Sequence, residues 1–171
     1  KKFYGPSTLR TGVEKSRNLM TVRIAQNIGI KNIAEFSKNL KIYENPEELL
    51  SLSLGSTETT LLKLTSAYCS FVNGGKQVIP KFIDRIQDSE GNTIFNSENR
   101  ECEGCDQISY LSNKIPKIKN NFKQVMSKES AYQMTSILEG TVKRGTAKGL
   151  KDLNLDIGGK TGTTNKNTDT W

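Results

Sequence analysis

Residues 5–23 of the 171-residue chain read GPSTLRTGVEKSRNLMTVR, and a helix is predicted to begin within this stretch. Apolar residues recur at helical spacing over Asn18–Asn27, and Gly29 then supplies a stop signal. The motif Ser16-Arg17-Asn18 stands at the start of that helix. Serine and asparagine are common at helix starts, so the motif taken alone indicates only a helix cap.

A second short motif, Lys160-Thr161-Gly162-Thr163, lies far downstream. Residues 156–163, which include it, are predicted to form a strand. A strand that enters a turn would explain Gly162 on backbone grounds alone. Each motif is weak evidence by itself, and the two together in one chain are stronger evidence.

Three further helices are predicted between the motifs, each from apolar periodicity and a capping residue. They are Ile30–Leu40, a helix capped by Thr59 or Thr60 that runs to Phe71, and a helix from Lys128 to about Lys143 capped by Ser127. The last of these is predicted to bury Ala131, Met134, Leu138 and Val142.

The segment between the second and third of these helices has a different character. Residues 78–86 and 93–95 are rich in β-branched and aromatic residues and flank a turn-forming stretch at 88–92, so they predict a hairpin. Residues 97–124 are polar and are expected to form a long surface loop, which makes 76–124 a hairpin and loop excursion. Periodicity therefore predicts an α+β fold with helix in excess.

Composition and charge exclude several classes of protein. The chain is 34% hydrophobic and 25% charged, as is ordinary for a globular protein, and no apolar run approaches the length of a membrane span. The net charge is +7, but the lysines are scattered without a block of like charges. A solvated basic surface is therefore the preferred interpretation, and nucleic-acid binding is not expected.

The chain contains three cysteines and no histidine. The missing histidine excludes Ser-His and Cys-His catalysis and most zinc sites, so neither a metal nor a cofactor is expected. Cys102 and Cys105 have metal-like spacing but no second ligand pair, because Cys69 stands alone in an apolar helical stretch. They are either a short-loop disulfide of an oxidising compartment or two ordinary thiols.

The order of Ser16-Arg17-Asn18 and Lys160-Thr161-Gly162-Thr163 resembles the active-site motifs of penicillin-recognising serine enzymes. Residues 5–23 are similar to the region around the second motif of class A penicillin-binding proteins. Four other segments also resemble that family: Leu54-Gly55-Ser56-Thr57-Glu58, Ala67-Tyr68, Asn73-Gly74-Gly75 and Arg144-Gly145-Thr146-Ala147. The resemblance implies the helix-rich part of the transpeptidase fold shared with serine β-lactamases, with residues 1–171 as a partial transpeptidase domain.

The resemblance also implies roles for the first motif and for the lysine of the second. Ser16 would relay a proton toward the leaving amine. Asn18 would hold a substrate amide, because its side chain offers both a donor and an acceptor. Lys160 would add positive charge that favours a substrate carboxylate.

The remaining residues of the second motif would bind substrate. The hydroxyls of Thr161 and Thr163 would bind the carboxylate, and the backbone N–H of Thr163 would form half of the oxyanion hole. Gly162 lacks a side chain, so the substrate backbone would lie against the strand. The catalytic residues implied are thus Ser16, Asn18, Lys160 and Thr163, and the substrate-binding residues are Thr161, Gly162 and Thr163.

One departure from the family pattern is decisive, because no serine of this chain is followed by lysine three residues later. Thr60-x-x-Lys63 and Thr163-x-x-Lys166 have the spacing, but the first lies in a predicted helix and the second overlaps the carboxylate-binding motif. The nucleophilic Ser-x-x-Lys segment is expected upstream of Lys1, and the closing strands of the sheet beyond Trp171. The chain is therefore expected to be a fragment that is inactive alone.

The leading functional hypothesis is a DD-transpeptidase that cross-links peptidoglycan stem peptides and is acylated by β-lactams. Its parent protein would be membrane-anchored outside this chain, at the periplasmic (extracytoplasmic) face of the inner membrane. Two alternatives remain at this point. One is a β-lactamase or penicillin sensor, and the other is a non-catalytic interaction module on the same scaffold.

Overall fold

The computed structural model describes residues 4–97, 100, 102–103, 117–119 and 121–163. The chain divides into two compact units, which we call the helical unit (residues 1–77 and 124–171) and the hairpin unit (residues 78–123). Within the described residues, every helix is too short or too polar to cross a membrane.

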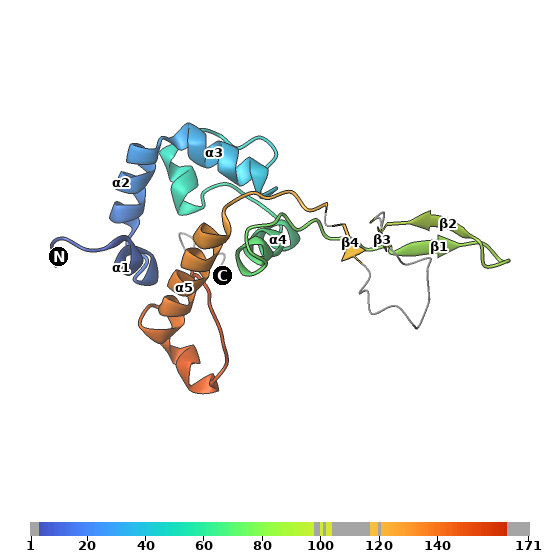
Figure 1. The fold of residues 1–171 in the computed structure, drawn as a ribbon. Helices are drawn as coiled ribbons and strands as arrows, with labels where there is room; N and C mark the ends of the chain where they lie inside the picture. The colour runs from blue at the N-terminus through green and yellow to red at the C-terminus, as the bar shows by residue number, and fades with distance from the viewer. Residues whose placement is uncertain (1–3, 98–99, 101, 104–116, 120, 164–171) are drawn as a thin grey trace. The chain divides into compact units, whose positions relative to one another are not determined.

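The helical unit contains five α-helices and two short 3₁₀ helices among its described residues (Figure 1). They are α1 (Leu9–Glu14), α2 (Asn18–Ile28), α3 (Ile30–Asn39), η1 (Leu50–Leu54), α4 (Leu61–Val72), α5 (Lys128–Lys143) and η2 (Lys148–Leu153). Gly29 separates α2 from α3 at φ +89°, a conformation that favours glycine. The predicted boundary at this residue is therefore confirmed.

Side-chain caps fix the starts of two predicted helices. The Thr60 hydroxyl accepts a hydrogen bond from the Lys63 N–H at the start of α4, and the Ser127 hydroxyl accepts one from the Ser130 N–H at the start of α5. Such a cap satisfies one of the N–H groups that have no partner within the helix.

The core of the helical unit is centred on α5, which contacts both α1 and α4 (Figure 1). Its buried residues are Ala131, Leu138, Gly140, Thr141 and Val142. Most of these side chains are small, so the neighbouring helices approach closely. Met134, which was predicted to be buried, is only half-buried.

The hairpin unit contains two small antiparallel pairs of strands. In the first, β1 (Arg85–Gln87) pairs with β2 (Thr93–Asn96), and Ile86 lies opposite Phe95. The Asp88 carboxylate accepts hydrogen bonds from the Glu90 and Asn92 N–H groups and so closes the turn. The predicted hairpin is confirmed, although its first strand begins at Arg85 and not at Val78.

The second pair lies in a region predicted to be loop, where β3 (Cys102–Glu103) pairs with β4 (Lys117–Ile118). Cys102 is disulfide-bonded. Cys105 lies outside the described residues, so the Cys102–Cys105 pairing stays a prediction. Cys69 is a free thiol in α4, where it is partly buried.

The predicted strand over residues 156–163 is not formed among the described residues. Only Thr163 takes part in a bridge, and residues 154–162 have no strand assignment. The Gly159 N–H donates instead to the Leu138 carbonyl of α5 over 3.2 Å. A strand requires a paired neighbour, and the described part of the helical unit supplies none at this segment. The sequence pattern also missed α1 and η2, both of which are short.

Leu138→Ala is expected to lower the free energy of unfolding by about 2–4 kcal/mol, because it leaves a cavity beside buried neighbours in α5. Leu138 is 5% exposed. Chemical denaturation of the purified protein measures the change. Tyr132→Ala is the matched control on the same helix, where the side chain is 75% exposed and a change within about 0.5 kcal/mol is expected. Equal losses in both variants would contradict a core centred on α5.

Candidate active site

Ser16 occupies the turn between α1 and α2 and is half-buried. Its φ is +51°, a left-handed conformation that is uncommon for a residue with a side chain. The turn is held by the Ser16 N–H, which donates to the Val13 carbonyl, and by the Arg17 N–H, which donates to the Gly12 carbonyl. Backbone strain of this kind concentrates at functional sites, so the turn is a candidate for one.

Lys160 lies directly against Ser16, although 144 residues separate them in sequence. The Lys160 ammonium donates to the Ser16 hydroxyl over 2.7 Å and to the Thr161 carbonyl over 2.6 Å. The side chain of Lys160 is half-buried, and this burial lowers its pKa from the ordinary value for lysine. The fold thus brings the first residues of the two motifs into contact.

Thr161 makes the second contact of the site, and its partner was not assigned a role from the sequence. Its hydroxyl lies 2.7 Å from the hydroxyl of Thr146, three residues beyond the end of α5. Thr146 belongs to the segment Arg144-Gly145-Thr146-Ala147, which was noted only for its resemblance to the family. No spacing rule pointed to this contact, because it joins two loops.

Asn18, Gly162 and Thr163 are exposed. Asn18 is the first residue of α2, and its side chain makes no hydrogen bond to another described residue in the helical unit. Gly162 and Thr163 follow the Lys160–Thr161 pair directly. The structure therefore joins Ser16 with Lys160 and leaves these three residues open to solvent within the described part of the chain.

The surroundings of Ser16 are basic. Lys15 and Arg17 flank it in sequence, and Lys160 contacts its hydroxyl. The Arg17 guanidinium stacks 3.9 Å from the centroid of the Tyr4 ring. Of these cations, Lys160 contacts the Ser16 hydroxyl itself, and its charge favours an anionic ligand there. Among the described residues, no group of three or more acidic or cysteine side chains could hold a metal ion.

Comparison with known families identifies this arrangement. The family described as "Penicillin binding protein transpeptidase domain" matches residues 1–170 of the chain. The chain belongs to the penicillin-binding protein transpeptidase domain family. The family that the two motifs indicated by resemblance is therefore confirmed.

Relatives and solved structures agree with the family. Penicillin-binding protein 1A of Rickettsia bellii is 46% identical over 99% of this chain and 22% of its own length. The crystal structure of penicillin-binding protein 1A from Haemophilus influenzae matches with a TM-score of 0.80 and 30% identity, over 99% of this chain and 28% of that one. The chain thus spans about a fifth of the length of the curated relatives that it matches.

A more distant structure shares the fold alone. It is the D,D-transpeptidase domain of a peptidoglycan glycosyltransferase from Eggerthella lenta, with a TM-score of 0.69 and 19% identity over 99% of this chain and 44% of that one. The predicted α+β transpeptidase fold and the affiliation with class A penicillin-binding proteins are confirmed by these matches. The roles of Ser16, Asn18 and the second motif stay predictions.

Proposed function

We propose that this chain is part of a DD-transpeptidase domain that cross-links peptidoglycan stem peptides by serine acyl transfer and is acylated by β-lactams. The observation that carries the proposal is the 2.7 Å hydrogen bond from Lys160 to Ser16, which unites the two motifs. Membership of the transpeptidase family supports it. Because the chain has no Ser-x-x-Lys segment, the nucleophilic serine is supplied by another part of the same protein.

The contact suits Ser16 for proton relay. Because the Lys160 ammonium donates to the Ser16 oxygen, the hydroxyl proton of Ser16 is directed away from Lys160 and toward the site. When that proton moves to the leaving amine, the developing negative charge on the Ser16 oxygen is stabilised by the adjacent ammonium, and the proton released by the nucleophilic serine replaces the one lost. The relay therefore works without histidine, which the chain lacks.

The exposed residues suit substrate binding. The positive charge of Lys160 and the hydroxyls of Thr161 and Thr163 hold the terminal carboxylate, and the Thr163 N–H completes half of the oxyanion hole. Gly162 is exposed and presents bare backbone to an extended peptide. The exposed Asn18 side chain would pair with a substrate amide through its donor and acceptor groups.

The protein would act at the periplasmic face of the inner membrane, anchored outside this chain. The disulfide at Cys102 supports an oxidising compartment, because such bonds are rare in the cytosol. Its partners there would be stem peptides and β-lactams.

Intact-mass spectrometry of the full-length gene product, before and after incubation with benzylpenicillin, tests the proposal. A stable adduct of the mass of benzylpenicillin is expected. The absence of any adduct would reject the transpeptidase assignment in favour of a non-catalytic module. An adduct that disappears within minutes, with release of hydrolysed penicillin, would instead indicate a β-lactamase.

Acylation is expected to fall as the pH rises through the lowered pKa of Lys160, below its ordinary value of 10.5, because the charged ammonium is the donor to Ser16. A stopped-flow pH profile of acylation measures the fall. In the same pH window the unfolded chain holds the Lys160 proton more tightly, so this lysine makes folding more favourable as the pH rises. The loss is therefore not caused by unfolding linked to Lys160.

Lys160→Arg is the control for this pH dependence, because a guanidinium stays charged throughout the window. The acylation rate that this variant retains is expected to persist to a higher pH than the rate of the wild type. A wild-type rate that is constant up to pH 10.5 would contradict the role of the ammonium.

A further inference from the structure

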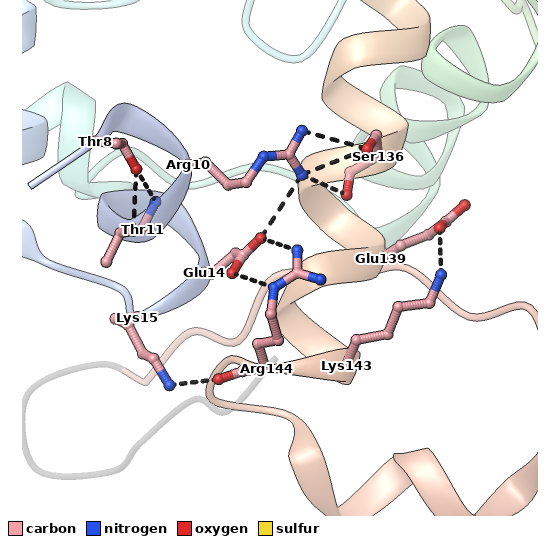
Figure 2. Close-up of polar contacts among 9 residues, drawn as sticks. All are labelled: Thr8, Arg10, Thr11, Glu14, Lys15, Ser136, Glu139, Lys143 and Arg144. Carbon is pink, nitrogen blue, oxygen red and sulfur yellow. Dashed lines mark hydrogen bonds and ion pairs between the residues drawn. The ribbon is translucent and has the colours of Figure 1, made fainter.

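The ends of α1 and α5 meet at an ion pair between the buried carboxylate of Glu14, two residues before Ser16, and the exposed side chain of Arg144. The Glu14 side chain is only 6% exposed. The Arg144 guanidinium donates two hydrogen bonds to the Glu14 carboxylate, from Nε to Oε2 over 3.2 Å and from Nη2 to Oε1 over 2.6 Å (Figure 2). A two-point contact of this kind fixes orientation as well as distance.

Other side chains reinforce this pair. Arg10 lies 3.7 Å from Glu14 Oε1 and also donates to the Ser136 carbonyl over 3.1 Å (Figure 2). The hydrogen bond from Arg144 holds the pKa of Glu14 below its ordinary value, so the carboxylate is charged. A Cβ atom at Gly140 would overlap the Glu14 carboxylate, so the absence of a side chain there admits it.

Backbone contacts join the same two ends. The Lys15 ammonium donates to the Arg144 carbonyl at the end of α5 (Figure 2). The Thr146 N–H donates to the Glu14 carbonyl over 3.1 Å. Both residues that precede Ser16 are therefore tied to the segment that follows α5. We call this set of residues, Glu14, Lys15, Arg144 and Thr146, the α1–α5 junction.

Thr146 extends the junction to the second motif. Its N–H binds Glu14, two residues before Ser16, and its hydroxyl lies 2.7 Å from that of Thr161, the residue after Lys160. One residue thus contacts both motif segments. The long side chain of Lys160 has many rotamers of its own, so its contact with Ser16 depends on how closely the two backbones are held.

We propose that Glu14, Arg144 and Thr146 are positioning residues that hold the Ser16 and Lys160 segments in register for proton relay. The catalytic consequence rests on the proposed function, whereas the structural consequence does not. Misplacement of reacting groups by about 1 Å can cost a rate about 100-fold. Loosening the junction is therefore expected to slow the relay without removing any group that touches substrate.

The test uses the full-length gene product with Glu14→Gln, Arg144→Lys and Thr146→Val. Glu14→Gln removes a negative charge. Arg144→Lys removes the two-point hydrogen bonding but keeps the positive charge, and Thr146→Val removes only a hydroxyl. Acylation by benzylpenicillin is expected to slow about 10- to 100-fold. Hydrogen exchange is expected to rise in both residues 15–18 and residues 157–163. Thr146→Ser restores the hydroxyl and is expected to return both measurements to wild-type values.

Glu139→Gln is the matched control. It breaks an exposed ion pair of 2.8 Å with Lys143 on the same helix, one residue from Arg144 (Figure 2). Neither acylation nor hydrogen exchange is expected to change, because among the described residues the Glu139 and Lys143 side chains make no hydrogen bond to either motif.

The outcomes separate the two proposals. Wild-type acylation and wild-type exchange in Thr146→Val and Arg144→Lys would overturn the positioning role. If the wild-type protein forms no adduct with benzylpenicillin, the proposed function is rejected. Hydrogen exchange alone then tests the positioning role. Raised exchange in both segments then upholds the junction, and unchanged exchange overturns it. If Glu14→Gln unfolds, Thr146→Val gives the decisive result, because its side chain is exposed and its loss leaves the core intact.

Discussion

Replacement of Lys160 by methionine is expected to slow acylation by benzylpenicillin about 10²- to 10³-fold, the range for losing a donor that stabilises developing negative charge. The variant keeps the length of the side chain and loses the ammonium that donates to Ser16 over 2.7 Å. The same change removes positive charge that favours the substrate carboxylate. The acylation rate of the full-length protein, followed by intact mass over time, measures the effect.

Lys148→Met is the control for this variant. Lys148 is an exposed lysine at the start of η2, so its replacement removes the same charge without touching either motif. Its acylation rate is expected to match that of the wild type. Equal acylation rates for the wild type and Lys160→Met would contradict the proposed relay. Equal losses of rate in Lys160→Met and Lys148→Met would show that the effect comes from net charge alone.

Gly145→Ala is expected to lower the free energy of unfolding by about 3 kcal/mol. An added Cβ atom would lie 2.7 Å from both the Cα and the carbonyl oxygen of Thr141, and closer still to the Glu14 carbonyl oxygen. These are backbone atoms, so a change of rotamer gives no relief. The substitution forces α1 away from the end of α5, and acylation should fall with stability.

Gly149→Ala is the comparison, because an added Cβ atom at that position meets nothing within 4 Å. Its stability is expected to stay within about 0.5 kcal/mol of the wild type. Thermal and chemical denaturation of both variants give the measurement. A Gly145→Ala protein as stable as Gly149→Ala would mean that the α1–α5 junction is looser than the structure indicates.

Local signals in the sequence were enough for most of the helices. The periodicity and caps around Thr60 and Ser127 predicted α4 and α5, and Gly29 predicted the break between α2 and α3. The caps succeed because a side chain and a helix N–H three residues later form a complete interaction. Short elements gave weaker signals. Helix α1 has only six residues, fewer than an isolated helix needs, and it is supported by contact with α5.

The predicted strand at residues 156–163 is not formed among the described residues, for a related reason. Its pattern is compatible with an extended chain, but strand pairing depends on a neighbour that the segment does not itself contain. In the structure its Gly159 N–H donates to the Leu138 carbonyl, within α5. A sequence window of this size carries no information about which partner its backbone groups will find.

The sequence by itself determined the identity of the candidate residues and the family, because both reside in short motifs whose residue types the chemistry requires. Only the tertiary structure decided which of these residues meet. Three contacts came from it: Lys160 with Ser16, Thr146 with Thr161, and Arg144 with Glu14. Those contacts join residues up to 144 positions apart. Glu14 reaches Arg144 because Gly140 and Gly145 leave room for it. The three distances depend on the packing of the whole unit, which no local pattern of residues encodes.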